Sequence, residues 1–160
     1  MGLFNWLKKD PEIKKAEFVS PATGKMIPIE QVEDEAFASK ILGDGFAVEL
    51  ADGEVIAPFD GEVTAAFPTG HAYGLKREDG LECLIHIGLD TVELNGAGFD
   101  VKVKQGDQVK QGQLLVKVNL EQIIGAGKSL VSPIVFSSGA AFTLLKNDSA
   151  VKGEEILHLE

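Results

Sequence analysis

A chain of 160 residues, 44% of them hydrophobic, has the size and composition of one globular domain, which excludes an intrinsically disordered protein. No apolar run is long enough to cross a bilayer, and the single Cys83 cannot form an internal disulfide, so we expect a cytoplasmic protein. Acidic residues number 25 against 15 basic ones, and the resulting net charge of −10 argues against nucleic acid and favours a basic protein partner.

The N-terminal residues 1–17 differ from the rest of the chain and are predicted to be a flexible tail. Leu3, Phe4 and Leu7 would share one face of a short helix, and several lysines follow them. This pattern is typical of an amphipathic segment on an anionic membrane surface, here the inner face of the cell membrane. The alternative is a frayed tail, because a helix this short is marginal in water.

The remaining residues, 18–160, are predicted to form one all-β domain. Turn-forming pairs such as Asp52-Gly53, Asp60-Gly61 and Asp79-Gly80 recur along the chain. Short runs of β-forming residues between such turns are typical of an antiparallel β-sandwich or barrel. A short helix is predicted at Leu120–Gly125. The segment Ile29–Leu42 is ambiguous, because Gln31–Phe37 is able to form a helical turn. The predicted strands are Phe46–Leu50, Val55–Ala57, Glu62–Phe67, Leu81–Ile87, Phe99–Val103, Leu114–Val118, Leu130–Phe136, Phe142–Leu145 and Ile156–Leu159.

His86 lies inside one of these apolar strands, where a titratable ring is unusual. Strand alternation places Leu84 and His86 on one face, and Cys83, Ile85 and Ile87 on the other. If the second face covers the core, Cys83 is a buried core residue and His86 points outward, which favours a functional site. The alternative is a core histidine whose ring is bound to a backbone carbonyl.

His71 follows Pro68-Thr69-Gly70 in a connection between two strands. A turn at Asp79-Gly80 would return the chain, so His71 and His86 could meet across neighbouring strands. Two adjacent imidazoles allow one to act as a nucleophile while the other hydrogen-bonds the attacked group. They could also bind zinc together with a third ligand from elsewhere. The third histidine, His158, is expected to be structural.

The segments around these histidines resemble the glucose-family enzyme IIA component of the bacterial phosphoenolpyruvate-dependent sugar phosphotransferase system. The resemblance extends from about Phe18 to the C-terminus, and several blocks occur in the family's order. These blocks are Lys40–Gly45, Ala57–Gly61, Thr69–Ala72, His86–Leu94 and the Gly106-Asp107…Gly112 pattern.

The resemblance implies an antiparallel β-sandwich and a phosphoryl carrier. It implies that His86 accepts a phosphoryl group from the histidine-containing phosphocarrier protein and passes it to a cysteine on the IIB domain of a sugar permease. His71 would stabilise the phosphoryl group, and Thr69 would hydrogen-bond a histidine of the site. No cofactor is required, and zinc would be bound by His71 and His86 only with a ligand from a partner.

The resemblance also implies a partner-docking surface around His86. Asp34 and Asp90 would pair with basic residues of the partner. This chain departs from the family at Glu35 and Ala36, where aliphatic residues are common. The apolar residues expected to form the docking ring are Phe37, Ile41, Leu42, Phe67, Ile87 and Val92.

Two other functions remain open from the sequence. The chain could be a regulatory binding module whose unphosphorylated form inhibits transporters or kinases, since a phosphate on His86 would place charge inside an apolar interface. It could also be a carrier of the biotinyl-lipoyl type, although it lacks the Met-Lys-Met or Asp-Lys-Ala motif that presents the modified lysine.

Overall fold

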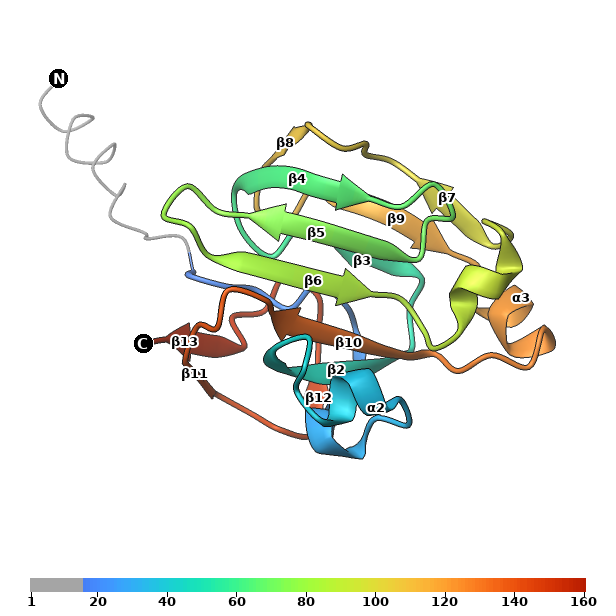
Figure 1. The fold of residues 1–160 in the computed structure, drawn as a ribbon, viewed down its shortest axis with the longest axis horizontal. Helices are drawn as coiled ribbons and strands as arrows, with labels where there is room; N and C mark the ends of the chain where they lie inside the picture. The colour runs from blue at the N-terminus through green and yellow to red at the C-terminus, as the bar shows by residue number, and fades with distance from the viewer. Residues whose placement is uncertain (1–15) are drawn as a thin grey trace, which may run out of the picture.

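An eight-stranded antiparallel sheet forms the larger layer of the structure, a computed structural model that describes residues 16–160 (Figure 1). Its strand order is β12-β1-β2-β10-β6-β5-β4-β8. Consecutive strands β4, β5 and β6 form a meander in one half of it, and β10 pairs with both β6 and β2. The strands of this sheet are β1 (Gly24–Pro28), β2 (Asp44–Leu50), β4 (Gly61–Ala66), β5 (Ala72–Lys76), β6 (Glu82–His86), β8 (Gln108–Val109), β10 (Val131–Phe136) and β12 (Ser149–Ala150).

Two smaller sheets complete the β structure of the described residues. The three-stranded sheet has the order β3-β9-β7, and β11 pairs with β13 in a two-stranded sheet. These strands are β3 (Glu54–Ile56), β7 (Phe99–Val101), β9 (Leu114–Val118), β11 (Phe142–Leu144) and β13 (Leu157–Leu159). Short helices lie in the connections: η2 (Ile29–Gln31), α2 (Glu35–Ala38), η3 (Thr91–Leu94) and α3 (Leu120–Gly125).

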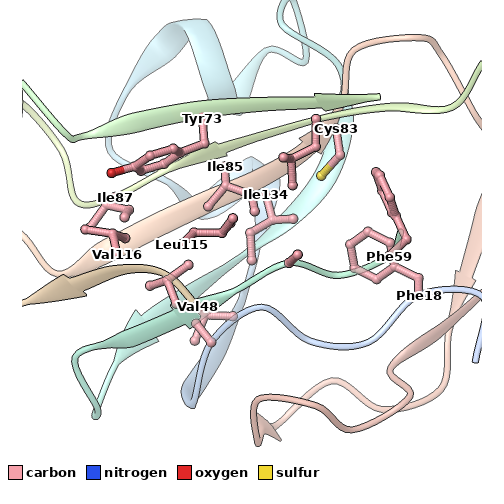
Figure 2. Close-up of a cluster of buried hydrophobic side chains, with 14 of the residues drawn as sticks. Phe18, Val48, Phe59, Tyr73, Cys83, Ile85, Ile87, Leu115, Val116 and Ile134 are labelled. Carbon is pink, nitrogen blue, oxygen red and sulfur yellow. The ribbon is translucent and has the colours of Figure 1, made fainter. Parts of the chain in front are cut away.

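The core lies between the large sheet and the three-stranded sheet. Tyr73, Ile85 and Ile134 come from the large sheet, and Leu115 and Val116 come from β9 (Figure 2). All five side chains are almost completely buried. Burying an aliphatic side chain of this size stabilises the fold by about 1.5–3 kcal/mol, so this contact between the sheets holds the sandwich together.

Alternation along β6 decides which side chains enter this core. Cys83, Ile85 and Ile87 are buried, whereas Leu84 and His86 are only partly buried on the opposite face. Burial raises the pKa of the Cys83 thiol, because the thiolate would lose its hydration. The predicted direction of His86 is therefore confirmed, and Cys83 is a core residue.

The predicted strands are all present, but the sequence prediction missed four strands. β8 and β12 have only two residues each and carry no periodic pattern. β1 includes Lys25 and ends in Pro28, and β5 contains Gly74, whose added Cβ would lie 3.0 Å from Thr64 Oγ1. Such residues weaken strand propensity, so pairing with neighbours rather than local preference forms these strands.

The predicted helix is confirmed, and the ambiguous segment Ile29–Leu42 is partly helical. The segment Leu120–Gly125 is α3, and the ambiguous stretch before β2 contains η2 and α2. Among residues 16–160, no helix is long and apolar enough to cross a bilayer. The tail prediction for residues 1–17 falls almost wholly outside the described residues, so the boundary between tail and domain stays a prediction.

Candidate functional site

The hairpin of β5 and β6 brings His71 and His86 together. Ala72 pairs with His86 across the two strands, and the Ile87 N–H donates to the His71 carbonyl at 2.7 Å. His71 thus directly precedes the residue opposite His86, and the two ring centroids lie 5.2 Å apart at an interplanar angle of 75°. Histidines 15 residues apart in sequence therefore form one site at the end of a hairpin.

An aromatic ring supports each histidine from the side. The Phe37 ring of α2 lies edge-on to His86, with centroids 5.2 Å apart, and the Phe67 ring after β4 lies edge-on to His71 at 5.3 Å. Edge-to-face contacts of this kind stabilise one ring orientation. The two imidazoles are consequently held between aromatic neighbours rather than free to rotate in solvent.

A backbone carbonyl fixes the tautomer of His86. Its Nδ1 lies 2.8 Å from the Gly88 carbonyl oxygen, which can only accept a hydrogen bond. Nδ1 must therefore carry a proton, and in the neutral ring Nε2 keeps its lone pair. The lone pair of the neutral His86 ring is thus on Nε2.

A hydroxyl is the corresponding partner of His71. Thr69 Oγ1 lies 2.6 Å from His71 Nδ1, and a hydroxyl can either donate or accept. When Thr69 donates, Nδ1 is the acceptor and the proton of the neutral ring is on Nε2. In that state the pair is complementary, since one Nε2 has a lone pair and the other an N–H.

Burial keeps both rings neutral. Desolvation lowers the pKa of His71, and the positive form of His86 would lower it further. Desolvation also lowers the pKa of His86, against the opposing effects of the Gly88 carbonyl, Asp34 and Asp90. Since the ordinary histidine pKa is about 6.5, both rings are mainly neutral near neutral pH.

The turn after β6 requires glycine at position 88. Its φ is +72°, a left-handed conformation that residues with a Cβ rarely adopt. A Cβ on Gly88 would lie 2.6 Å from both the Ser129 carbonyl oxygen and Thr91 Cγ2. Only glycine therefore lets the chain turn so sharply that its carbonyl faces the His86 ring.

The residues expected at a docking surface divide into two groups. Four are exposed: Ile41 (78%), Leu42 (37%), Phe67 (46%) and Val92 (49%). In contrast, Phe37 and Ile87 are 3% and 0% exposed, so in this conformation they are buried beneath the expected docking surface and are not part of it.

Two acidic residues stand close enough to influence His86. Asp34 caps α2 by accepting a hydrogen bond from the Ala36 N–H at 3.0 Å, and Asp90 directly precedes η3. Both charges raise the pKa of His86. Their pairing with basic residues of a partner stays a prediction.

The site by itself offers too few ligands for zinc. Both Nδ1 atoms already have hydrogen-bond partners, which leaves one Nε2 on each histidine. In the part of the chain that the structure describes, no group of three or more His, Cys, Asp or Glu side chains could hold a metal. A tetrahedral zinc site needs more ligands than two, so zinc binding with a partner ligand stays a prediction.

Sequence reasoning missed two buried hydroxyls beside the site. Thr91 and Ser132 are 0% and 2% exposed, and both bond to the turn that follows His86. A serine within the apolar strand β10 is the feature that could have been noticed in the sequence. His158 lies elsewhere, with Nδ1 3.7 Å from Glu17 Oε1 on an exposed surface.

Comparison with known proteins gives consistent matches. The family model described as phosphoenolpyruvate-dependent sugar phosphotransferase system, EIIA 1, matches residues 16–142. A PTS system glucose-specific EIIA component of Staphylococcus aureus is 43% identical over 150 residues, covering 91% of this chain and 90% of the relative. The protein of the same name from Staphylococcus epidermidis is 46% identical over 125 residues, which cover 78% of this chain and 75% of that relative. The solved structure of glucose permease IIA from Mycoplasma capricolum superposes with a TM-score of 0.82 at 39% identity, covering 88% of this chain and 92% of that one.

Proposed function

The chain belongs to the EIIA 1 family of the phosphoenolpyruvate-dependent sugar phosphotransferase system, and from this membership we propose that His86 is its phosphoryl-carrying residue. Proteins of this family are phosphoryl carriers in sugar transport. The observation that carries the assignment to His86 is the hydrogen bond from its Nδ1 to the Gly88 carbonyl, which leaves Nε2 as the free nucleophile.

The proposed donor is the histidine-containing phosphocarrier protein. His86 Nε2 attacks the phosphorus, an N–P bond forms, and the donor's N–P bond breaks with its electron pair returning to the donor ring. Transfer then needs mainly alignment and charge stabilisation, because little bonding to phosphorus remains in the transition state. The fixed tautomer of His86 supports this role, since no proton must leave Nε2 before attack.

The proposed acceptor is a cysteine on the IIB domain of a sugar permease. Its thiolate attacks the phosphorus, and the bond to His86 Nε2 breaks. His71 would hold the phosphoryl group during both transfers by donating its Nε2–H to a phosphoryl oxygen. The hydrogen bond between Thr69 and His71 Nδ1 supports this role when the hydroxyl donates.

Both partners would dock on the surface around His86. Four exposed apolar side chains would become buried when a partner docks, and Asp34 and Asp90 would pair with its basic residues. The net charge of −10 favours approach of a basic protein. We propose that the chain acts in the cytoplasm, with residues 1–17 as its contact with the inner face of the membrane.

Phosphotransfer with purified partners tests the proposal. The wild-type chain should become labelled on histidine when incubated with the phosphorylated phosphocarrier, and His86→Ala should not. His71→Gln should still accept the label but donate it more slowly to a IIB domain. Equal donation rates for wild type and His71→Gln would remove His71 from the mechanism.

The exposed apolar surface also supports a regulatory role as a second function. An unphosphorylated chain would bind a transporter or kinase through this surface and inhibit it. A phosphate on His86 would place charge at the centre of the contact and weaken it. Pull-downs with the two phosphorylation states should recover such a target only with the unphosphorylated form, and equal recovery would contradict this role.

A further inference from the structure

The turn after β6 is held through both of its peptide groups. In the Ile87–Gly88 peptide, the carbonyl accepts from the Thr91 hydroxyl at 2.5 Å and the N–H donates to Ser132 Oγ at 2.9 Å. In the Gly88–Leu89 peptide, the carbonyl accepts from His86 Nδ1 and the N–H donates to the Ser129 carbonyl at 3.3 Å. Rotation of either peptide would therefore break hydrogen bonds on both of its sides.

Two of these four partners are buried hydroxyls in apolar surroundings. Thr91 and Ser132 are 0% and 2% exposed, and Ser132 begins the buried part of β10, which continues to Phe136. The Ser132 hydroxyl also donates to the Leu130 carbonyl at 3.1 Å, so its lone pairs remain available to the Gly88 N–H. A hydroxyl buried without a hydrogen-bond partner would destabilise the fold. Hydrogen bonds to the turn satisfy the Thr91 hydroxyl and, together with the Leu130 carbonyl, the Ser132 hydroxyl.

We propose that Thr91 and Ser132 are positioning residues, which hold the Ile87–Gly88 peptide so that the Gly88 carbonyl keeps the His86 proton on Nδ1. Neither hydroxyl has a hydrogen bond to a histidine ring, so both act through the backbone. Without them the peptide can rotate, and the neutral ring can take the other tautomer, in which Nε2 carries the proton. The consequence for phosphoryl acceptance rests on the proposed function, whereas the effect on the tautomer does not.

Nitrogen-15 NMR of the histidine rings tests this directly, because the two ring nitrogens report which of them carries the proton. Wild type should show a single His86 tautomer with the proton on Nδ1. Ser132→Ala and the isosteric Thr91→Val should both populate the Nε2–H form. Their initial rates of phosphoryl acceptance should fall by up to about tenfold, the change in rate that corresponds to the loss of one neutral hydrogen bond. Thr91→Ser retains the hydroxyl and should restore both the wild-type tautomer and the rate.

Ser20→Ala is the matched control. Ser20 is also a fully buried serine whose hydroxyl donates to a backbone carbonyl and accepts from a backbone N–H, both of Ala22. Its hydrogen bonds involve no residue of the site. It should therefore lose stability in the manner of Ser132→Ala and yet keep the wild-type His86 tautomer and acceptance rate.

The proposal is overturned if Ser132→Ala and Thr91→Val keep the wild-type His86 tautomer. Should Ser132→Ala fail to fold, the Thr91→Val and Thr91→Ser pair decides by the same spectra. A wild-type chain that accepts no phosphoryl group would instead refute the proposed function, and the spectra would still decide the role of the two hydroxyls.

Discussion

At the scale of single residues, the proposed function depends on which His86 nitrogen carries a proton. The sequence predicted that His86 points outward, because alternation in β6 is a local property. It could not predict the tautomer, which depends on a left-handed Gly88 and on the direction of its carbonyl. Nor could it predict Thr91 and Ser132 as partners of the turn, since Ser132 lies 44 residues beyond Gly88 and meets it only after the sheet forms.

The acids beside His86 should raise its pKa. Both Asp34 and Asp90 favour the protonated ring, so the double variant Asp34→Asn, Asp90→Asn should have a lower His86 pKa than wild type. Asparagine suits both positions, because it caps helices well and tolerates the left-handed φ of +60° at Asp90. An NMR titration measures the shift, and an unchanged or higher pKa would contradict the assigned electrostatics.

At the scale of elements, the site is made by one hairpin and the turn that follows it. The predicted return of the chain at Asp79-Gly80 is confirmed by the pairing of β5 with β6. The prediction did not include β5 as a strand, because its alanine and glycine give little local preference. The meeting of the two histidines was therefore predictable from the turn, but their register was not.

Replacing Gly88 by alanine should damage both the turn and the function. The left-handed backbone alone costs an L-residue about 1–2 kcal/mol. In addition, the new Cβ would lie 2.6 Å from its neighbours, so the turn must move and its carbonyl must leave the His86 ring. Gly88→Ala should therefore have a lower unfolding free energy in urea and a strongly reduced rate of phosphoryl acceptance.

Gly80→Ala is the control for backbone strain, because it lies in the turn at the other end of the same hairpin. Gly80 has a φ of +98°, and nothing lies within 4 Å of an added Cβ. This variant should lose stability through its backbone alone and accept the phosphoryl group at the wild-type rate. If Gly88→Ala retained the same rate as Gly80→Ala, the turn would not be required for transfer.

At the scale of the whole molecule, the composition and turn spacing correctly predicted an antiparallel β-sandwich or barrel, and the structure is a sandwich, as the match to the solved Mycoplasma capricolum structure supports. The order of strands was not predictable, because β10 and β2 join the sheet through pairings distant in sequence. The exposed or buried state of Phe37 and Ile87 was likewise a property of the folded molecule. The sequence pattern indicates which residues share one face of a strand or helix. Packing in the folded molecule decides whether that face is buried or exposed to solvent.

The buried His71 and the partly buried His86 should make the stability of the fold pH-dependent. Their pKa values are lowered from 6.5 in the folded chain, so the unfolded chain binds more protons once the pH falls below that value. The free energy of unfolding should thus be independent of these rings above about pH 7 and decrease from about pH 6.5 downward. Urea unfolding between about pH 5 and 8 should show this slope, and His71→Gln, His86→Gln should reduce it. An equal slope in the double variant would contradict the burial of neutral rings.

The most direct test of the central claim is to identify the phosphorylated atom by NMR after transfer from the phosphorylated phosphocarrier protein. Phosphorus-31 and nitrogen-15 spectra of the labelled chain should show a phosphoryl group bonded to Nε2 of His86, with Nδ1 still protonated. A label on His71 or His158, on Nδ1 of His86, or undiminished in His86→Ala would contradict the account.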